Sequence, residues 1–480
     1  MMGAQDAFEG LMTLAGRATP DFVTFDAAAP ALATRFKADE AAAAALAAGA
    51  TMAADLWTLR AGEAQSVRVA PREAAASLSS FAYQRFGDPA KAPPRDGVAA
   101  MARTAAHGFK PTGDGRHVFL HPSFPPGVQR ILAALGCPDD ADAVSRACLA
   151  RSALEIEDAV AERHGCTGMV RSPEEWDATE QGRILAGLPV VELIKIADSP
   201  PEPPPPGGDM PLSGLRVLDL TRVLAGPTCA RTLAQYGAEV LYLASQTLPA
   251  SVGFVSDTNH GKLSAWLELG EAAGRERLRE LAREADVFSQ GYRTGSLERL
   301  GFGPLDLARL RPGIIYVSIN CYGHEGPWRA RAGWEQLAQT VTGMAHVHGG
   351  AEGPKLQPAA VTDYTTGYLA AFGAMAALKR RALYGGSYVV RVSLCQTGMW
   401  VRGLGVEGPE RLERVEKLEP DEIGAYSIER DTGYGPMTYL RPAVQMSATP
   451  ARWKRPVTPL GTHQPEWPLE GSKVPTMEAR

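Results

Sequence analysis

Residues 211–229 read PLSGLRVLDLTRVLAGPTC, and this stretch decides the fold class. Residues 215–220 form a short apolar run with one acid, between Ser-Gly at 213–214 and Gly-Pro at 226–227, which predicts a buried strand ending at a tight loop. A helix is expected to begin at about Thr228. In open α/β sheets, ligands bind at the carboxyl ends of the strands, and a helix N-terminus there attracts anions. The stretch therefore predicts a place for a phosphate-bearing ligand.

The chain beyond this strand alternates between predicted strands and helices. The predicted strands cover residues 239–243, 262–269, 286–290, 311–323 and 388–394. The predicted helices cover residues 228–236, 271–284 and 364–382. Because βαβ alternation places parallel strands side by side with helices on both faces, we expect an α/β fold with a Rossmann-like parallel sheet.

A proline-rich segment divides the chain, which at 480 residues is long enough for two or more domains. Residues 199–211 read SPPEPPPPGGDMP and predict an extended linker over 199–210. We expect a small α+β domain before it, residues 98–198, and the α/β domain after it, residues 211–402. The tail, residues 403–480, carries many prolines and charges. It is expected to wrap around another part of the protein or a partner subunit, or to be partly disordered.

Two segments far apart in the sequence share one plan. Residues 54–75 (ADLWTLRAGEAQSVRVAPREAA) and 376–398 (AALKRRALYGGSYVVRVSLCQTG) both contain a helix end, a glycine turn and the strand VRV. This similarity predicts an internal repeat of one supersecondary unit. A Pro/Gly-rich break at 86–97 follows the first copy, so we expect residues 1–97 to form a partial copy.

The composition indicates a globular protein that binds neither nucleic acid nor membranes. Hydrophobic residues make up 45% of the chain and charged residues 21%, with a formal net charge of −5. No apolar run approaches the roughly 20 residues of a membrane span, and the N-terminus lacks the basic and apolar regions of a signal peptide. We therefore expect a cytoplasmic protein.

Cysteine and histidine spacing does not predict a metal site. The six cysteines are scattered without a CxxC pair, which in a chain of this length favours reduced, mostly buried thiols. His117, His121 and His164 have no metal-ligand spacing.

Two acids are the candidates for chemistry, because no GxGxxG, P-loop, GxSxG or HExxH motif occurs in a usable context. Glu335 and Gln339 are spaced to share one helical face, and Asp363 lies at a predicted helix start. An acid at a helix start can be a plain N-cap. It can also be a nucleophile that attacks an acyl carbonyl and forms a mixed anhydride.

Residues 211–402 resemble the family III CoA-transferases through several motifs in the family's order. These motifs are PLSGLRVLDLTRVLAGP (211–227), YGAEVLYL (236–243), NHGKLSAWLEL (259–269), ADVFSQGYRTGSLERLGF (285–302), RPGIIYVSINCYGHEGP (311–327) and VTDYTTGYLAAFGAMAAL (361–378).

The resemblance implies roles for individual residues. Asp363 would be the nucleophile that forms aspartyl anhydride and aspartyl-CoA intermediates, and Glu335 would lie beside it and help to place substrate or a proton. The CoA pocket would be lined by Arg222, Val223, Leu224 and Ala225. The CoA phosphates or adenine would be approached by Lys262, Tyr292, Arg293 and Arg299. CoA and acyl-CoA would be substrates with a carboxylic acid, no cofactor would be tightly bound, and the protein would be an interlocked homodimer.

The chain departs from the family pattern in ways that concern the acyl substrate and the domain order. Leu224 stands where the family often has glutamine, Leu263 replaces the usual arginine, and the second strand ends in Ala244–Ser245 without a charged residue. Residues 98–190 resemble the family's small domain yet precede the catalytic segment. The resemblance is therefore to a rearranged or fused tandem form whose first copy lacks its nucleophile.

Two other functions are compatible with the same motifs. An α-methylacyl-CoA racemase belongs to the same superfamily, but that chemistry needs a base on each side of the α-carbon. This chain has Trp334–Glu335 where racemases carry His-Asp. A catalytically silent CoA-binding protein is the second alternative, favoured by the partial first copy and opposed by the retention of Asp363 with Glu335.

Overall fold

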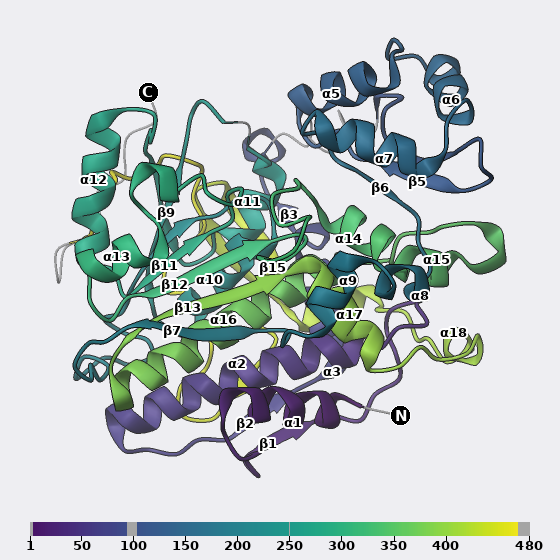
Figure 1. The fold of residues 1–480 in the computed structure, drawn as a ribbon. Coiled ribbons are helices and arrows are strands. Elements are labelled where there is room, and N and C mark those ends of the chain that lie inside the picture. Colours follow the sequence, from purple (N-terminus) through teal and green to yellow (C-terminus); the bar gives the residue numbers. More distant parts are fainter. Residues whose placement is uncertain (1–2, 94–102, 249, 469–480) are drawn as a thin grey trace.

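The computed structural model describes residues 3–93, 103–248 and 250–468 of the chain (Figure 1). Its centre is a seven-stranded sheet with the strand order β10-β9-β8-β11-β12-β13-β7. The strands span Lys262–Trp266 (β10), Glu239–Ala244 (β9), Arg216–Leu220 (β8), Val287–Gln290 (β11), Ile315–Asn320 (β12), Ser387–Ser393 (β13) and Glu192–Ala197 (β7). The α/β fold with its Rossmann-like sheet and flanking helices is confirmed, as is the smaller α+β unit described below.

The sheet departs from the predicted all-parallel arrangement at one edge. β7 pairs antiparallel with β13, whereas every other neighbour pair in this sheet is parallel. The residues of β7 lie within the segment expected to be the small domain. The expected boundary at residue 198 therefore cuts through the α/β layer, because β7 supplies its edge strand.

Alternating side chains of the strands pack into two separate cores, one on each face of the sheet. Val217, Val240 and Val317 lie in the core formed with α10 (Ala225–Gln235) and α16 (Val361–Tyr384). Leu218, Leu241 and Phe288 lie in the opposite core with α12 (Ala272–Arg283) and α13 (Pro304–Leu310). The period of two positions along the strands therefore explains why helices cover both faces.

The helix after β8 begins one turn earlier than its residue pattern predicts. α10 starts at Ala225, so Gly226 and Pro227 lie inside the first turn. Proline is tolerated there because the first amides of a helix have no intrahelical acceptor. The strand and the helix start are thus separated only by residues 221–224, which places this loop at the carboxyl edge of the sheet.

A long alanine-rich helix, α2 (Ala38–Ala61), packs against α16 beneath the sheet (Figure 1). By length and composition α2 could cross a membrane, but 78% of its most apolar window is buried inside the molecule. Alanine allows close helix approach, and the face of Gly49 lies against Met375 of α16. α2 is therefore a core helix of this fold.

The N-terminal segment and the C-terminal tail form two small sheets together. β1 (Val23–Phe25), β2 (Val67–Val69) and β16 (Gln445–Met446) form one, and β14 (Ser427–Thr432), β15 (Gly435–Leu440) and β3 (Arg85–Phe86) form the other. The same two segments also contain the helices α1 (Ala4–Ala15), α3 (Pro71–Ser77), α18 (Glu410–Glu413) and α19 (Pro420–Ala425). As far as residue 468, the tail thus wraps another part of the same chain. Its last twelve residues lie outside the described residues.

The small α+β unit stands apart at the upper right of Figure 1. It contains the antiparallel sheet β4 (Gly108–Pro111), β5 (His117–Leu120) and β6 (Thr167–Met169), covered by α5 (Pro125–Leu135), α6 (Ala141–Leu149) and α7 (Ala153–Glu162). The short helices α8 (Pro173–Asp177) and α9 (Glu180–Ala186) lead from it to β7. Its expected start at residue 98, with part of the break at 86–97, lies outside the described residues.

Candidate active site

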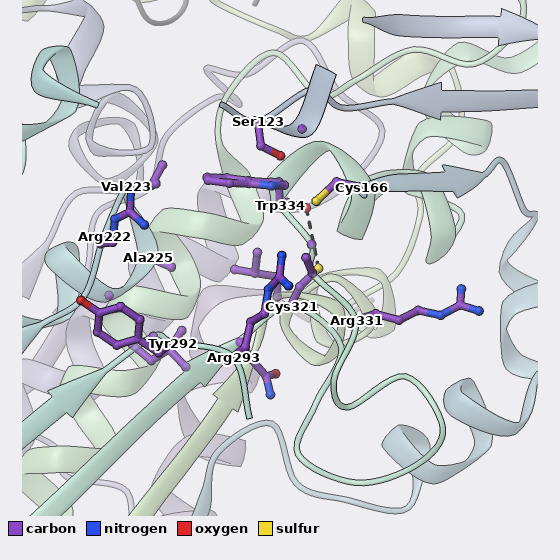
Figure 2. A pocket seen from close by; sticks show the side chains of 18 of the residues that line it. Ser123, Cys166, Arg222, Val223, Ala225, Tyr292, Arg293, Cys321, Arg331 and Trp334 are labelled. Atoms are coloured by element: carbon purple, nitrogen blue, oxygen red, sulfur yellow. Dashed lines mark hydrogen bonds between the residues drawn. The ribbon is translucent and has the colours of Figure 1, made fainter. Parts of the chain in front are cut away.

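A cavity of about 470 Å³ lies between the small α+β unit and the carboxyl edge of the central sheet (Figure 2). The small unit contributes five residues of the segment 123–130 and residues 164–166. The α/β unit contributes the loop after β8, the segment after β11, and residues 329 and 331–334 among others. Of the residues expected at the site, this lining includes Arg222, Val223, Leu224, Ala225, Tyr292, Arg293 and Asp363.

Asp363 is the acid that meets this cavity. It is the third residue of α16, and only 7% of its surface is exposed. α16 packs closely beneath the loop at Gly367, which has no side chain. A Cβ at this position would lie only 2.6 Å from the Ala225 carbonyl oxygen, so a larger residue would push the helix away. This close helix packing sets the position of the carboxylate relative to residues 221–225.

Glu335 holds the start of α16 from the neighbouring helix α14 (Glu335–Val341). Its carboxylate accepts the backbone N–H of Asp363 at 2.5 Å and that of Thr362 at 3.0 Å. It also accepts the Thr362 hydroxyl and the Gln339 amide, the latter at 2.5 Å. Glu335 therefore lies beside Asp363 as expected, but all its described contacts anchor the protein and it does not line the cavity.

Burial and proximity raise the pKa of Asp363. Removal from water is the larger cause, and the nearby Glu335 carboxylate adds to it. Burial also raises the pKa of Glu335, while its four hydrogen-bond donors oppose that rise. The donors favour the charged form of Glu335, so Asp363 is the more easily protonated of the two acids.

A buried ion pair shapes the loop after β8. The Lys262 ammonium contacts Asp219 Oδ2 at 2.7 Å and the Pro227 carbonyl oxygen at 2.8 Å, and neither charged side chain is exposed. Asp219 Oδ1 in turn accepts the backbone N–H of Thr221 at 3.0 Å. Lys262 was expected to approach the CoA phosphates, yet it does not line the cavity. The structure gives it a position under the cavity floor instead.

The same loop contains a strained residue. Val223 has a φ of 72°, in the left-handed region that β-branched residues rarely adopt. Its neighbour Arg222 lies over the ring of Phe124 at 5.1 Å, which joins the loop to the small α+β unit. Strain of this kind persists where the surroundings impose it, often at binding sites.

Arginines dominate the polar lining of the cavity. Those at positions 130, 222, 293, 329 and 331 all line it, and Asp363 is the one acid among the described lining residues. Arg331 is already paired with Asp158 at 3.2 Å. Arg299, expected near the phosphates, lies outside this lining and contacts Ser296 at 3.5 Å. The lining thus suits an anionic ligand.

The sequence suggests Trp334 as a wall of the pocket, and the structure adds the partners that hold it beside Asp363. The Trp334 indole stacks on His121 with ring centroids 5.2 Å apart and planes within 5°, and Phe124 meets its edge at 5.6 Å. The Cys166 and Cys321 thiols complete this wall (Figure 2). The sequence signal for Trp334 is its place directly before Glu335. His121, which lies 213 positions earlier, has no such signal in the sequence.

A second cavity of about 240 Å³ adjoins the first. Both are lined by Leu248, Tyr292 and Ser296, and the second continues between the ends of β9 and β10. Its walls are mostly leucine, with Ser245, Thr247 and Glu268 as polar groups. Among the described residues, no group of histidine, cysteine and acidic side chains has a metal-binding arrangement.

The chain is thus an α/β protein with an inter-domain cavity whose described lining holds one buried carboxylate and several arginines. The family model described as CoA-transferase family III matches residues 3–200 and 212–406. The chain belongs to this family.

Relatives of the chain carry related names. It is 34% identical to the acetyl-coenzyme A transferase nodX of Hypoxylon pulicicidum, over 64% of this chain and 56% of that protein. It is 38% identical to the human succinyl-CoA:glutarate CoA-transferase, over 35% of this chain and 41% of that protein. The crystal structure of Rv3272 from Mycobacterium tuberculosis is 30% identical over 41% of this chain and 58% of that one, with a TM-score of 0.39. The chain spans about half the length of the curated relatives it matches.

Proposed function

We propose that the chain transfers CoA between an acyl-CoA thioester and a carboxylic acid, with Asp363 as the nucleophile. The observation that supports this most is the position of Asp363, buried at a helix start yet lining the cavity. A partly desolvated carboxylate is a stronger nucleophile than a hydrated one, and the N-terminus of α16 favours its negative charge.

The reaction would use two exchanges at Asp363. Its carboxylate attacks the thioester carbonyl, and the carbon–sulfur bond breaks. CoA leaves as a thiolate, and the acyl group stays on Asp363 as a mixed anhydride. The thiolate then attacks the Asp363 carbonyl, which releases the first acid as a carboxylate and leaves an aspartyl-CoA thioester. The acceptor carboxylate attacks this thioester and the same two steps run in reverse, so that Asp363 is regenerated without net proton transfer.

The chain's other residues would position the substrate. Glu335 is a positioning residue, because its described contacts all fix the start of α16. The loop 221–225 would lie along the pantetheine arm, and the adjoining cavity beside Tyr292 would take the nucleotide end. Of the arginines around the larger cavity, Arg222 and Arg329 would pair with phosphates.

Trapping of the acyl-enzyme tests this proposal. The protein is incubated with a panel of acyl-CoAs and hydroxylamine, and the modified residue is located by peptide mass spectrometry. We expect a hydroxamate at Asp363, none in Asp363→Ala, and an unchanged yield in the control Asp21→Asn, which alters an exposed acid far along the chain. Absence of any adduct across the panel would favour a silent CoA-binding protein. Deuterium exchange at the α-carbon without acyl transfer would favour a racemase.

We further infer that residues 3–93 are a partial copy of the unit that carries Asp363. One spacing of 323 positions separates Ala38 from Val361, Gly62 from Gly385 and Val67 from Val390. The helices α2 and α16 each have 24 residues. The surrounding strands also correspond, because β2 has a parallel neighbour and an antiparallel neighbour, as β13 has.

The partial copy would have no nucleophile of its own. At the same spacing, Glu40 occupies the position of Asp363, and the buried Arg411 guanidinium contacts both its carboxylate oxygens at 3.0 Å. The trapping experiment therefore predicts one adduct per chain. An adduct at Glu40 would contradict this inference. Cytoplasmic location and a homodimer complete the proposal, and light scattering of the purified chain tests the latter.

A further inference from the structure

Two arginines from different units meet at one carbonyl group on the cavity wall. Arg130 of α5 donates Nη1–H to the His164 carbonyl oxygen at 3.1 Å, and Arg293, after β11, donates Nη2–H to the same oxygen at 3.5 Å. His164 itself has a φ of 56°, an uncommon conformation that presents this carbonyl. Both arginines line the larger cavity.

Neither guanidinium has a carboxylate partner within residues 3–93, 103–248 and 250–468. Arg331, on the same cavity, differs because Asp158 and Glu157 pair with it at 3.2 and 3.6 Å. Two cations that share a single neutral acceptor repel each other, and an anion between them would remove this repulsion. Each guanidinium has further N–H donors in the planar arrangement that suits a carboxylate.

The arginine pair lies beside the cavity wall that contains Trp334, Cys166 and Cys321. Burial raises the pKa of Cys166, and both guanidiniums are close enough to oppose that rise. Figure 2 shows the Arg293 side chain directed toward Cys321, below Trp334. The smaller cavity, proposed above for the nucleotide end of CoA, adjoins the first at Leu248, Tyr292 and Ser296, and neither arginine of the pair lines it.

We propose that Arg130 and Arg293 bind the second carboxylate of a dicarboxylic acyl group, so that the acids exchanged at Asp363 are dicarboxylates. This inference rests on the proposed CoA transfer and names its substrate class. Because one arginine belongs to the small α+β unit and the other to the α/β unit, the bound carboxylate also bridges the two sides of the cavity. A phosphate of CoA has similar chemistry and is the competing ligand.

Matched substrates separate these ligands. Succinyl-CoA and butyryl-CoA have acyl chains of equal length and differ in the terminal carboxylate, so the ratio of their kcat/KM values isolates its recognition. We expect wild-type protein to prefer succinyl-CoA, and Arg130→Gln and Arg293→Gln each to reduce that ratio about 10- to 100-fold. The kcat/KM for butyryl-CoA and the affinity for free CoA should stay unchanged. Arg163→Gln, an exposed residue beside His164 that does not line the cavity, is the control.

Other results overturn the proposal. Equal losses with both acyl-CoAs together with weaker binding of free CoA would assign the pair to a phosphate. Transfer of butyryl-CoA by the wild type without preference would reject the dicarboxylate while leaving CoA transfer intact. If no acyl-CoA reacts, the proposed function fails instead. In that case, calorimetry with glutarate and butyrate tests the carboxylate site directly. Equal binding of the two acids, or no binding of either, would reject the arginine pair as a site for a second carboxylate.

Discussion

The backbone N–H of Asp363 donates to the Glu335 carboxylate at 2.5 Å, so an acid from one helix caps the helix that carries the candidate nucleophile. A cap normally comes from the residue before the helix, and here Ala360 occupies that position without a side-chain acceptor. Glu335 therefore fixes the direction of α16 and places a negative charge beside Asp363. The helix direction and the added charge both affect the Asp363 carboxyl group, and the two effects can be separated by experiment.

Glu335→Gln should lower kcat and shift the pH profile. The oxygen of the glutamine amide can still accept a hydrogen bond from α16, but its NH₂ group would face N–H and O–H donors. We therefore expect kcat to fall about 10- to 100-fold, the range of one lost positioning interaction. Because Glu335 raises the pKa of Asp363, its neutral replacement should move the acid limb of the kcat/KM profile to lower pH. Reduced activity with an unmoved acid limb would show that Glu335 acts through geometry alone.

Asp363→Asn should abolish transfer and stabilise the fold. The pKa of Asp363 is raised above its ordinary value of 3.8, so the folded protein holds its proton to higher pH than the unfolded chain. Stability is therefore lost as the pH rises from about 3.8 through the folded-state pKa. The asparagine removes this loss, and thermal melts should show a larger gain at pH 8 than at pH 4. An equal gain at both values would contradict a raised pKa.

The fold followed from local pattern, whereas the site depended on contacts between distant residues. The strands β8, β9 and β11 were predictable from apolar runs bounded by glycine and acidic residues, and the proximity of Glu335 to Asp363 followed from the family motifs. The stack of His121 on Trp334 and the meeting of Arg130 with Arg293 join segments more than 100 positions apart. Periodicity carries no information about such pairs.

The expectation for Lys262 is a second case in which the sequence did not reveal a contact between distant residues. A lysine in a motif of a CoA-binding family suggests an ammonium that faces the ligand. Whether the ammonium is exposed or buried depends on whether the interior holds an acidic side chain that can pair with it. Asp219 is such a partner, and it lies 43 positions earlier on β8. The ion pair orders the loop without contacting the cavity.

Lys262→Met should destabilise the protein strongly. It leaves the Asp219 carboxylate buried without its cation, and loss of one partner from a buried pair costs about 3–5 kcal/mol. Urea denaturation of Lys262→Met and of Lys262→Met/Asp219→Leu measures this cost. The double variant should recover part of the loss, because no charge then stays buried. Weak binding of CoA by a fully stable Lys262→Met protein would instead support a direct phosphate contact.

Val223→Gly should separate stability from substrate binding. Val223 holds a φ of 72°, where glycine has no Cβ penalty, so the substitution should relieve about 1 kcal/mol of backbone strain. Glycine also adds freedom to the unfolded chain and to the loop, which lowers preorganisation of the cavity floor. We expect an unchanged or slightly raised free energy of unfolding together with a several-fold higher KM for acyl-CoA and little change in kcat. Val223→Ala keeps the strain but removes the side chain, so it serves as the control for lost contacts. If the alanine variant raises KM as much as the glycine variant, the Val223 side chain itself contacts CoA, and the strained backbone has no separate role in binding.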